Sequence, residues 1–425
     1  MRATAQRLEF IQDYLTSLFG SDLHVKRVCS LSLAVLGVMT SASLAVAVIG
    51  QALAQARGKA AKHAIKQVDR LLSNQGIDVW DLFPLWIQEA IGASRDLVVA
   101  MDWTEFDADD QSTLALNLVT KHGRAQPLLW FSVFKAELAG KRNDIEDMCL
   151  SRLKEALPKE AKVTILADRG FGDVKLFGFL GELDFGYVIR FRGDIFVTAA
   201  DGETRRAEDW VGAGGRARKL AGAEISKEKQ KVGAVVCVHA KGMKDAWHLA
   251  ASDGEATTRA IINLYSRRWS IEPEFRDTKD LRFGMGLSAV RVGDPYRRDR
   301  LLLLSAIAVM LLTLLGGAGE ALGMDRLLKS NTVKRRVHSL FCQGCLYYDA
   351  IPNMPEPTLL ALMERFRALI MENSVTAAVL TVGLKMRGCL SVEGREGFSI
   401  AFVIFDEPPA SRRPSEGPLD DPALG

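Results

Sequence analysis

The sequence predicts an α/β protein whose mixed core is flanked by helical domains on both sides. Before residue 96 apolar residues recur at helical spacing, from 96 to 191 β-rich runs alternate with helical ones, and after 286 helical patterns return. We therefore divide the chain into a helical N-terminal domain at 1–95, a core at 96–320 interrupted by a β-rich insertion at 192–250, a helical C-terminal region at 321–406 and a disordered tail at 407–425.

The composition is that of an ordinary globular protein. Of the 425 residues, 48% are hydrophobic and 25% are charged, which is enough to bury substantial cores. The 55 basic residues nearly balance the 52 acidic ones, and a net charge of +3 is too small to indicate a nucleic-acid partner. Only local clusters of charge could therefore indicate a nucleic-acid partner.

Cysteine usage predicts reduced thiols. Six cysteines are scattered over a long chain, which indicates a cytosolic protein rather than a disulfide framework. Cys342 and Cys345 form one C-x-x-C beside His338. A structural zinc site needs four ligands, and because no second pair has matching spacing, we do not expect zinc here.

Two uncharged stretches, Cys29–Ala56 and Leu301–Gly319, are long enough to cross a membrane. Polar residues dilute the first, and its segment Thr40–Ser43 predicts the N-cap of a second helix. The second follows the core directly, where a buried helix is apolar all round. We expect two buried helices and one core helix, with a membrane protein as the alternative that fractionation would detect.

The N-terminal domain is expected to contain a basic helix at Gly58–Asn74. Helical spacing puts Lys62 and Lys66 on its polar side, opposite an apolar stripe. A solvated basic face explains this pattern as well as a surface that binds phosphate groups does. The helix therefore needs a second observation before it indicates a function.

The core is expected to begin with a three-stranded meander. Apolar and β-rich runs separated by polar turns predict strands, and an amphipathic stretch ending at a proline predicts a helix. The expected order is strands at Asp96–Phe106, Ser112–Thr120 and Pro127–Phe134, a helix at Lys141–Leu157, and strands at Val163–Ala167 and Tyr187–Phe191.

Two aspartates end strands of this core. Asp102 lies in the first strand, and Asp168 directly follows the fourth. They would meet if those two strands were neighbours in the sheet. Taken singly, such an aspartate is more often a turn or cap residue than a metal ligand.

A third carboxylate lies among cations in Leu264–Lys279. At helical spacing one face carries Tyr265, Arg268, Glu272, Arg276 and Lys279. Such a face suits metal-assisted chemistry on a phosphodiester, because the acid can hold a divalent cation while the basic side chains bind phosphate oxygens. A solvated helix with ion pairs is the alternative. Pro273 directly follows Glu272 and predicts a helix start or a kink there.

The ordered pattern Y-x2-R-x3-E-x6-K resembles the signature of cut-and-paste DNA transposases of the DDE class, insertion-sequence family four. The resemblance covers roughly Asp96–Gly286. It implies a ribonuclease H-like catalytic core in which Asp102, Asp168 and Glu272 are the catalytic residues. It also implies that these three hold two Mg²⁺ ions about 3.5–4 Å apart, for which Mn²⁺ can substitute.

The same resemblance implies the partners. Tyr265, Arg268 and Lys279 would bind phosphate near the transposon end, with Arg276 beside them. Trp247, in the insertion, resembles a tryptophan that stacks a flipped base, although a core aromatic is as good an explanation. Beside such a core, the helix of Lys62 and Lys66 is expected to bind double-stranded DNA, namely the terminal inverted repeats of the transposon.

The expected function is therefore cleavage at transposon ends through a hairpin intermediate and strand transfer into target DNA. The resemblance implies a homodimer on paired ends, in the cytoplasm of a bacterium and associated with its nucleoid, without a membrane. Two alternatives stay open. The chain could be a metal-dependent nuclease of the same fold that cuts without joining, or a catalytically inactive DNA-binding regulator derived from a transposase.

The segment after the core is expected to be mostly helical. We expect a basic loop at Arg291–Arg300, a helical pattern at Met324–Gly344 that includes Lys334–Arg336, and a helix at Pro357–Asn373. This region could contact DNA or form the dimer interface. The tail at 407–425 contains five prolines and no aromatic residue, a composition typical of disorder.

Overall fold

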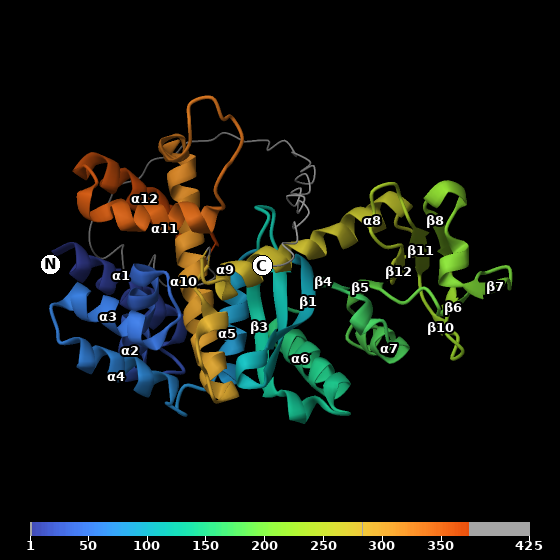
Figure 1. Ribbon diagram of the computed structural model, residues 1–425, viewed down its shortest axis with the longest axis horizontal. Coiled ribbons are helices and arrows are strands. Elements are labelled where there is room, and N and C mark those ends of the chain that lie inside the picture. The colour runs from blue at the N-terminus through green and yellow to red at the C-terminus, as the bar shows by residue number, and fades with distance from the viewer. Residues whose placement is uncertain (1, 283, 374–425) are drawn as a thin grey trace, which may run out of the picture. The chain divides into compact units, whose positions relative to one another are not determined.

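The computed structural model of the protein describes residues 2–282 and 284–373 (Figure 1). The predicted helical character of the N-terminal region is confirmed. Its helices are α1 (Arg2–Phe19), α2 (Val25–Ser41), α3 (Val46–Arg57), α4 (Ala61–Leu72) and α5 (Val79–Ile91). Their apolar sides join the same large hydrophobic cluster as the strands that follow.

The uncharged stretch at Cys29–Ala56 forms two helices, as expected, but its predicted cap is wrong. The hydroxyls of Thr40 and Ser41 donate to carbonyls within α2. The residue that caps α3 is Ala45, whose side chain offers no acceptor. Ser43 instead accepts the amide of Ala45 at 3.2 Å. The polar residues therefore complete the end of α2 and the turn, because the chain reverses at Ala42, where φ is 46°.

One described helix, α10 (Pro295–Ala321), is long and apolar enough to cross a membrane, and α2 with α3 would make a second if the pair were one span. However, 72% of the most apolar window of α10 is buried inside the protein, and α2 and α3 are bent by 96° relative to each other. This burial favours the core helix that the sequence predicts.

The core sheet has eight strands in the order β3-β2-β1-β4-β5-β12-β11-β8. The predicted meander is confirmed, because β1 (Asp96–Phe106), β2 (Gln111–Val119) and β3 (Ala125–Phe134) pair antiparallel. Next come β4 (Lys162–Ala167), parallel to β1, and β5 (Gly186–Arg190), parallel to β4. The connecting helices are α6 (Arg142–Ala156) and α7 (Val174–Glu182).

Part of the insertion continues this sheet. Its strands β12 (Trp247–Ala251), β11 (Ala234–Val238) and β8 (Arg218–Ala221) extend the sheet beyond β5 by antiparallel pairing. A separate small sheet contains β6 (Phe196–Thr198), β7 (Thr204–Arg206), β9 (Glu224–Ile225) and β10 (Gln230–Lys231). The predicted β-rich character is confirmed, and three of the insertion's strands are one with the core.

Alternation along the strands decides which face the acids share. Val99 and Met101 of β1 belong to the large hydrophobic cluster, whereas Ala100 of β1 and Leu166 of β4 belong to a second, smaller one. That smaller cluster includes residues of α8 (Thr258–Ser266) and α9 (Ile271–Lys279). These two helices therefore cover the face that Ala100 shares with Asp102, which is two residues further along β1.

The expected basic loop at Arg291–Arg300 is wrong in its second half, because α10 already begins at Pro295. Asp294 caps the helix by accepting the amide of Arg297 at 2.9 Å. Arg298 and Arg300 are buried in its first turns, where Arg300 donates to the backbone carbonyls of the N-terminal region. The charges could be buried because each has partners from other elements.

After α10 the described chain forms a 3-10 turn at Met324–Leu328, then α11 (Leu340–Ala350) and α12 (Glu356–Asn373). The helix predicted near the C-terminal end is confirmed. The helical pattern predicted for Lys334–Arg336 is wrong, since α11 begins only after Ser339, whose hydroxyl accepts the amide of Cys342. The predictions for 374–406 and for the tail at 407–425 lie outside the described residues.

Candidate active site

Two of the predicted acids lie side by side at one edge of the sheet. Strands β1 and β4 pair in parallel up to Met101 and Ala167, so Asp102 and Asp168 come next on neighbouring strands. Asp168 ends β4 and accepts the amide of Gly170 at 2.7 Å, which fixes the turn that follows. Asp102 accepts the amide of Trp103 at 2.9 Å. The two strands are neighbours, which is the condition under which these aspartates were expected to meet.

Glu272 lies in the first turn of α9, with 53% of its side chain exposed. The helix start expected at Pro273 is confirmed, because a 3-10 turn at Arg267–Ser270 separates α8 from α9. Pro273 is the third residue of α9, where the amide that proline lacks would have no helical partner. The 3-10 turn interrupts the single helix expected for Leu264–Lys279, but Arg268 and Glu272 still contact each other at the expected spacing of four residues.

Arg268 links the first acid to the third. Its Nη1 lies 3.3 Å from Asp102 Oδ2, and its Nη2 lies 3.6 Å from Glu272 Oε1. Only 9% of the Arg268 side chain is exposed. Its buried Nε has no hydrogen-bond partner among the described residues. The guanidinium is therefore held in place between these two acids.

The pKa of Asp102 shows that the three acids act on one another. Burial raises it from 3.8 to about 6, Arg268 lowers it, and the charges of Asp168 and Glu272 raise it. Such mutual repulsion means that the three carboxylates share one electrostatic neighbourhood. A cation placed among them would relieve it.

The residues fit a hard divalent cation by their chemistry, because carboxylate oxygens are the donors that Mg²⁺ and Mn²⁺ prefer. Within 2–282 and 284–373, no group of three or more His, Cys, Asp or Glu side chains converges as a finished metal site. Arg268 lies between two of the three acids. Asp102, Asp168 and Glu272 are the residues that would hold such an ion.

Trp247 and Tyr265 pack against each other beside the acids. Their rings meet edge to face, with centroids 4.9 Å apart at an angle of 74°. Trp247 opens β12 and is half-buried, whereas Tyr265 is 2% exposed. The structure thus brings both predicted residues to one place, and the ring of Tyr265 serves the small core beneath α8.

Arg190 is a candidate that the sequence reasoning missed. It ends β5, donates from Nη2 to the carbonyl of Ala246 at 2.9 Å, and lies 3.8 Å from Asp245. Its side chain is 17% exposed, and its Nε has no partner among the described residues. Burial raises the pKa of Tyr265, and the charges of Arg268 and Arg190 oppose that rise. The signal was its place near the end of a predicted strand, since the carboxyl ends of neighbouring parallel strands share one edge.

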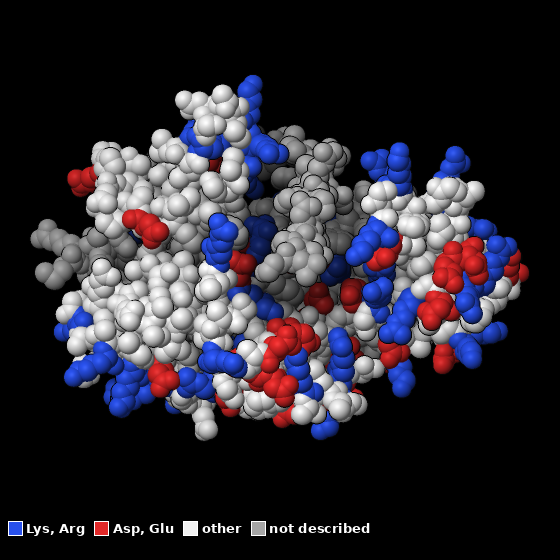
Figure 2. Space-filling model, viewed as in Figure 1, with Lys and Arg blue, Asp and Glu red and all other residues white. Residues whose placement is uncertain are grey.

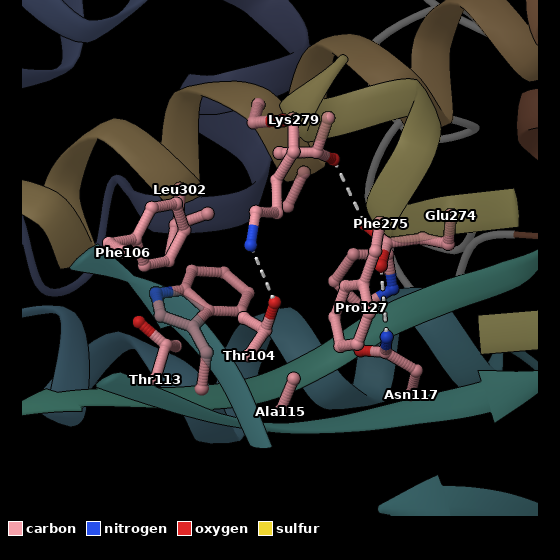
Figure 3. Close-up of a pocket in the computed structure, with 14 residues that line it drawn as sticks. Thr104, Phe106, Thr113, Ala115, Asn117, Pro127, Glu274, Phe275, Lys279 and Leu302 are labelled. Carbon is pink, nitrogen blue, oxygen red and sulfur yellow. Dashed lines mark hydrogen bonds between the residues drawn. The ribbon is translucent and has the colours of Figure 1, made fainter. Parts of the chain in front are cut away.

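The remaining predicted cations are dispersed. Arg276 is exposed on α9, whereas the Lys279 ammonium points beneath the helix towards β1 (Figure 3). Lys62 and Lys66 lie on the exposed side of α4, which packs against α2 and α3. In Figure 2 basic side chains gather at the lower left, where Figure 1 shows α4, and they mix with acidic ones over the insertion.

Comparison with known proteins agrees with this geometry. A family model described as the transposase DDE domain matches residues 93–311, slightly more than half of the chain. The matched span runs from just before β1 into α10 and contains all three acids, Arg268 and the insertion. Curated proteins give no match to the chain.

Proposed function

The chain belongs to the transposase DDE domain family, and from that premise we propose that it cuts DNA at the ends of a mobile element and joins them to target DNA. The family consists of enzymes of the polynucleotidyl transferase or nuclease type. The observation that carries the proposal is that buried Arg268 joins Asp102 to Glu272, while Asp168 follows the strand paired with that of Asp102.

The metal is proposed to be Mg²⁺, in two ions, with Mn²⁺ as a substitute. DDE transposases generally use divalent cations, and three carboxylates supply the oxygen ligands that these ions prefer. When bound, the ions would activate the attacking hydroxyl or water and stabilise the leaving oxygen of an in-line displacement. Asp102 and Asp168 would hold them from the rigid sheet, and Glu272 from the start of α9.

The side chains around the acids are proposed to bind the DNA backbone. Arg268 carries a planar guanidinium suited to a phosphate. Arg190 carries the same group at the end of β5. Tyr265 would orient Arg268 beneath the phosphate, while the exposed Arg276 would contact the backbone further along the DNA.

The finer family assignment is proposed as insertion-sequence family four. Its support is the Y-R-E-K pattern together with the sheet order, in which an antiparallel meander is followed by two parallel strands, as a ribonuclease H-like core requires. On this assignment Trp247 would stack a flipped base, and cleavage would pass through a hairpin before strand transfer. Lys62 and Lys66 would bind the terminal repeats by phosphate contacts.

The working unit is proposed to be a homodimer on two paired ends, because both ends of an element must be joined to one target. The proposed location is the bacterial cytoplasm, in association with the nucleoid. The described C-terminal helices α11 and α12 would contribute either to the dimer or to DNA contact.

The test is cleavage of a duplex that carries the terminal repeats of the protein's own element, in Mg²⁺, with nicks, hairpins and joined products scored separately. We expect all three products from the wild type and none from Glu272→Ala or Asp168→Asn, while both variants still bind the duplex. Nicks without joined products would support the nuclease alternative. Binding without any cutting in the wild type would support the inactive regulator.

A further inference from the structure

The Lys279 ammonium faces the protein, not the solvent side of α9. Its Nζ donates to Thr104 Oγ1 at 3.0 Å and to the carbonyl of Glu105 at 2.7 Å. It also lies 4.5 Å from the centroid of the Phe106 ring. Figure 3 shows the side chain descending from α9 into a cavity of about 30 Å³, with its nitrogen directed at Thr104 on β1.

These contacts use most of the hydrogen-bond donors of the Lys279 ammonium. An ammonium has three donors, and two of them are taken by β1. Burial lowers the pKa of Lys279, as does Arg298, while Glu105 and Asp107 raise it. A phosphate on the outer side of α9 could compete for the third donor only.

Lys279 and Glu272 lie on the same side of α9, and the residues of β1 to which they are linked lie on the same face of that strand. Lys279 follows Glu272 by seven residues, which is two helical turns and therefore the same side of α9. Thr104 follows Asp102 by two residues, which is the same face of β1. One end of α9 is thus linked to β1 through Arg268 and Asp102, and the other through Lys279 and Thr104.

We infer that Lys279 is a positioning residue, which fixes the far end of α9 on β1 and thereby sets where Glu272 stands relative to Asp102. This inference rests on the proposed function, because it takes these two acids as ligands of one metal site. It gives Lys279 a role different from the phosphate contact that the sequence pattern suggests. The residue acts through Glu272 and does not itself touch DNA.

Two further contacts keep α9 attached without Lys279, so its removal should shift the helix and not release it. Asn117 of β2 donates to the buried Glu274 at 3.1 Å, and Arg124 donates to Asp277 at 2.7 Å. Both partners of α9 come from the meander, on the side away from β4. Loss of Lys279 would therefore leave α9 held more firmly towards β2 than towards the acids.

The first measurement is the binding of Mn²⁺ alone to the full chain by titration calorimetry. Lys279→Met keeps the apolar stem and removes the donors, and Arg276→Met removes an exposed cation one turn earlier on the same helix. We expect Lys279→Met to weaken Mn²⁺ binding by about tenfold or more, as the loss of a group that orients a ligand does. Arg276→Met should leave Mn²⁺ affinity within about twofold of the wild type.

The second measurement is binding of a random-sequence duplex without metal, as a function of salt. Arg276→Met should reduce the slope of log affinity against log salt by about one, the signature of a lost phosphate contact, whereas Lys279→Met should leave it unchanged. If Lys279→Met instead reduces this slope and leaves Mn²⁺ affinity intact, the inference is overturned and the phosphate role stands.

A third variant changes the acceptor on β1 and leaves the sequence of α9 unchanged. Thr104→Val removes only the hydroxyl acceptor, and should weaken Mn²⁺ binding less than Lys279→Met does. Combined with Lys279→Met it should add little, because both changes break one link; full additivity counts against the link. If Asp168→Asn leaves the Mn²⁺ binding of the wild type unchanged, or if the wild type binds no Mn²⁺, the proposed metal site is overturned as well. This outcome distinguishes failure of the proposed function from failure of the inference about Lys279 alone.

Discussion

Arg268 Nη1 lies 3.3 Å from Asp102 Oδ2, although 166 positions separate the two residues along the chain. The same guanidinium reaches Glu272 through Nη2. The arginine therefore joins the start of α9 to Asp102 within β1. Its two contacts join the strand-borne acid to the helix-borne one.

Replacement of Arg268 should abolish cleavage while preserving the fold. Arg268→Gln keeps a hydrogen-bond donor but removes the charge, so we expect cleavage of end-bearing duplex to fall by about 10²-fold or more. Arg268→Lys should recover only a small part, because an ammonium cannot reach both Asp102 and Glu272 at once. Cleavage rates in Mg²⁺ and the melting temperature check this. Recovery to near wild-type rates by the lysine variant would contradict it.

Buried Arg298 should be worth far more to stability than exposed Arg291, although both lie near Asp109. Arg298 has 0% of its side chain exposed and lies 2.6 Å from Asp109, whereas Arg291 is 76% exposed and 3.8 Å away. We expect Arg298→Met to lower the free energy of unfolding by about 3–5 kcal/mol, because it removes the close, buried partner of Asp109 and the donor to buried Gln111, and leaves that carboxylate with the more distant, exposed Arg291. Arg291→Met should change it by less than about 0.5 kcal/mol. Equal effects in urea denaturation would refute the difference.

Asp299 should make the protein less stable as the pH rises. Its complete burial raises its pKa from 3.8 to about 8, against the opposing effects of Ser132, Arg298 and Arg300. The folded state therefore keeps a proton that the unfolded chain loses above about pH 4, and the free energy of unfolding falls between about pH 4 and about pH 8.

Asp299→Asn should remove this contribution, because its amide oxygen can still accept the amide of Ser132, now 3.1 Å from the carboxylate. The slope of unfolding free energy against pH should become shallower by up to about 1 kcal/mol per pH unit. Urea denaturation between about pH 5 and about pH 8 measures it. An unchanged slope in Asp299→Asn would contradict the prediction.

We expect Trp247 to contribute to hairpin formation, a step that follows DNA binding. If it stacks a flipped base, Trp247→Ala should reduce hairpin formation by about 10- to 100-fold and leave first-strand nicking nearly intact, since stacking on an aromatic ring contributes about 1–3 kcal/mol. Trp247→Phe should retain most of the activity. A fluorescent adenine analogue placed at the end of the element reports the unstacking directly. If Trp247→Ala abolishes nicking and also lowers the melting temperature, Trp247 is instead a core residue that packs against Tyr265.

The order of strands in the core could be predicted because local pattern and topology agree there. The meeting of Asp102 and Asp168 was expected only on the condition that their strands were neighbours, which the structure shows. Strand β1 has the predicted bounds, and Pro273 correctly marked the start of α9. These are features set within a few residues of sequence.

What the sequence could not show depended on contacts between distant segments. Lys279 looked like a surface cation because its acceptors, Thr104 and the carbonyl of Glu105, are 174 or more positions away. Arg298 and Arg300 looked like a basic loop for the same reason. Arg190 carried no pattern of its own, and became a candidate only when β12 paired beside it.

The pairing of β12 with β5 sets a limit on how this protein can diverge. Leu249 of β12 pairs with Arg190 of β5. This register fixes the position of Trp247 relative to the end of β5, and therefore relative to the sheet edge where Asp168 lies. Segments between β5 and β12 can lengthen or shorten through evolution without moving that tryptophan. A deletion of one residue within β12 would turn its ring to the opposite face of the sheet. Length polymorphism in relatives should therefore be confined to the loops and the small sheet, and spare β12 itself.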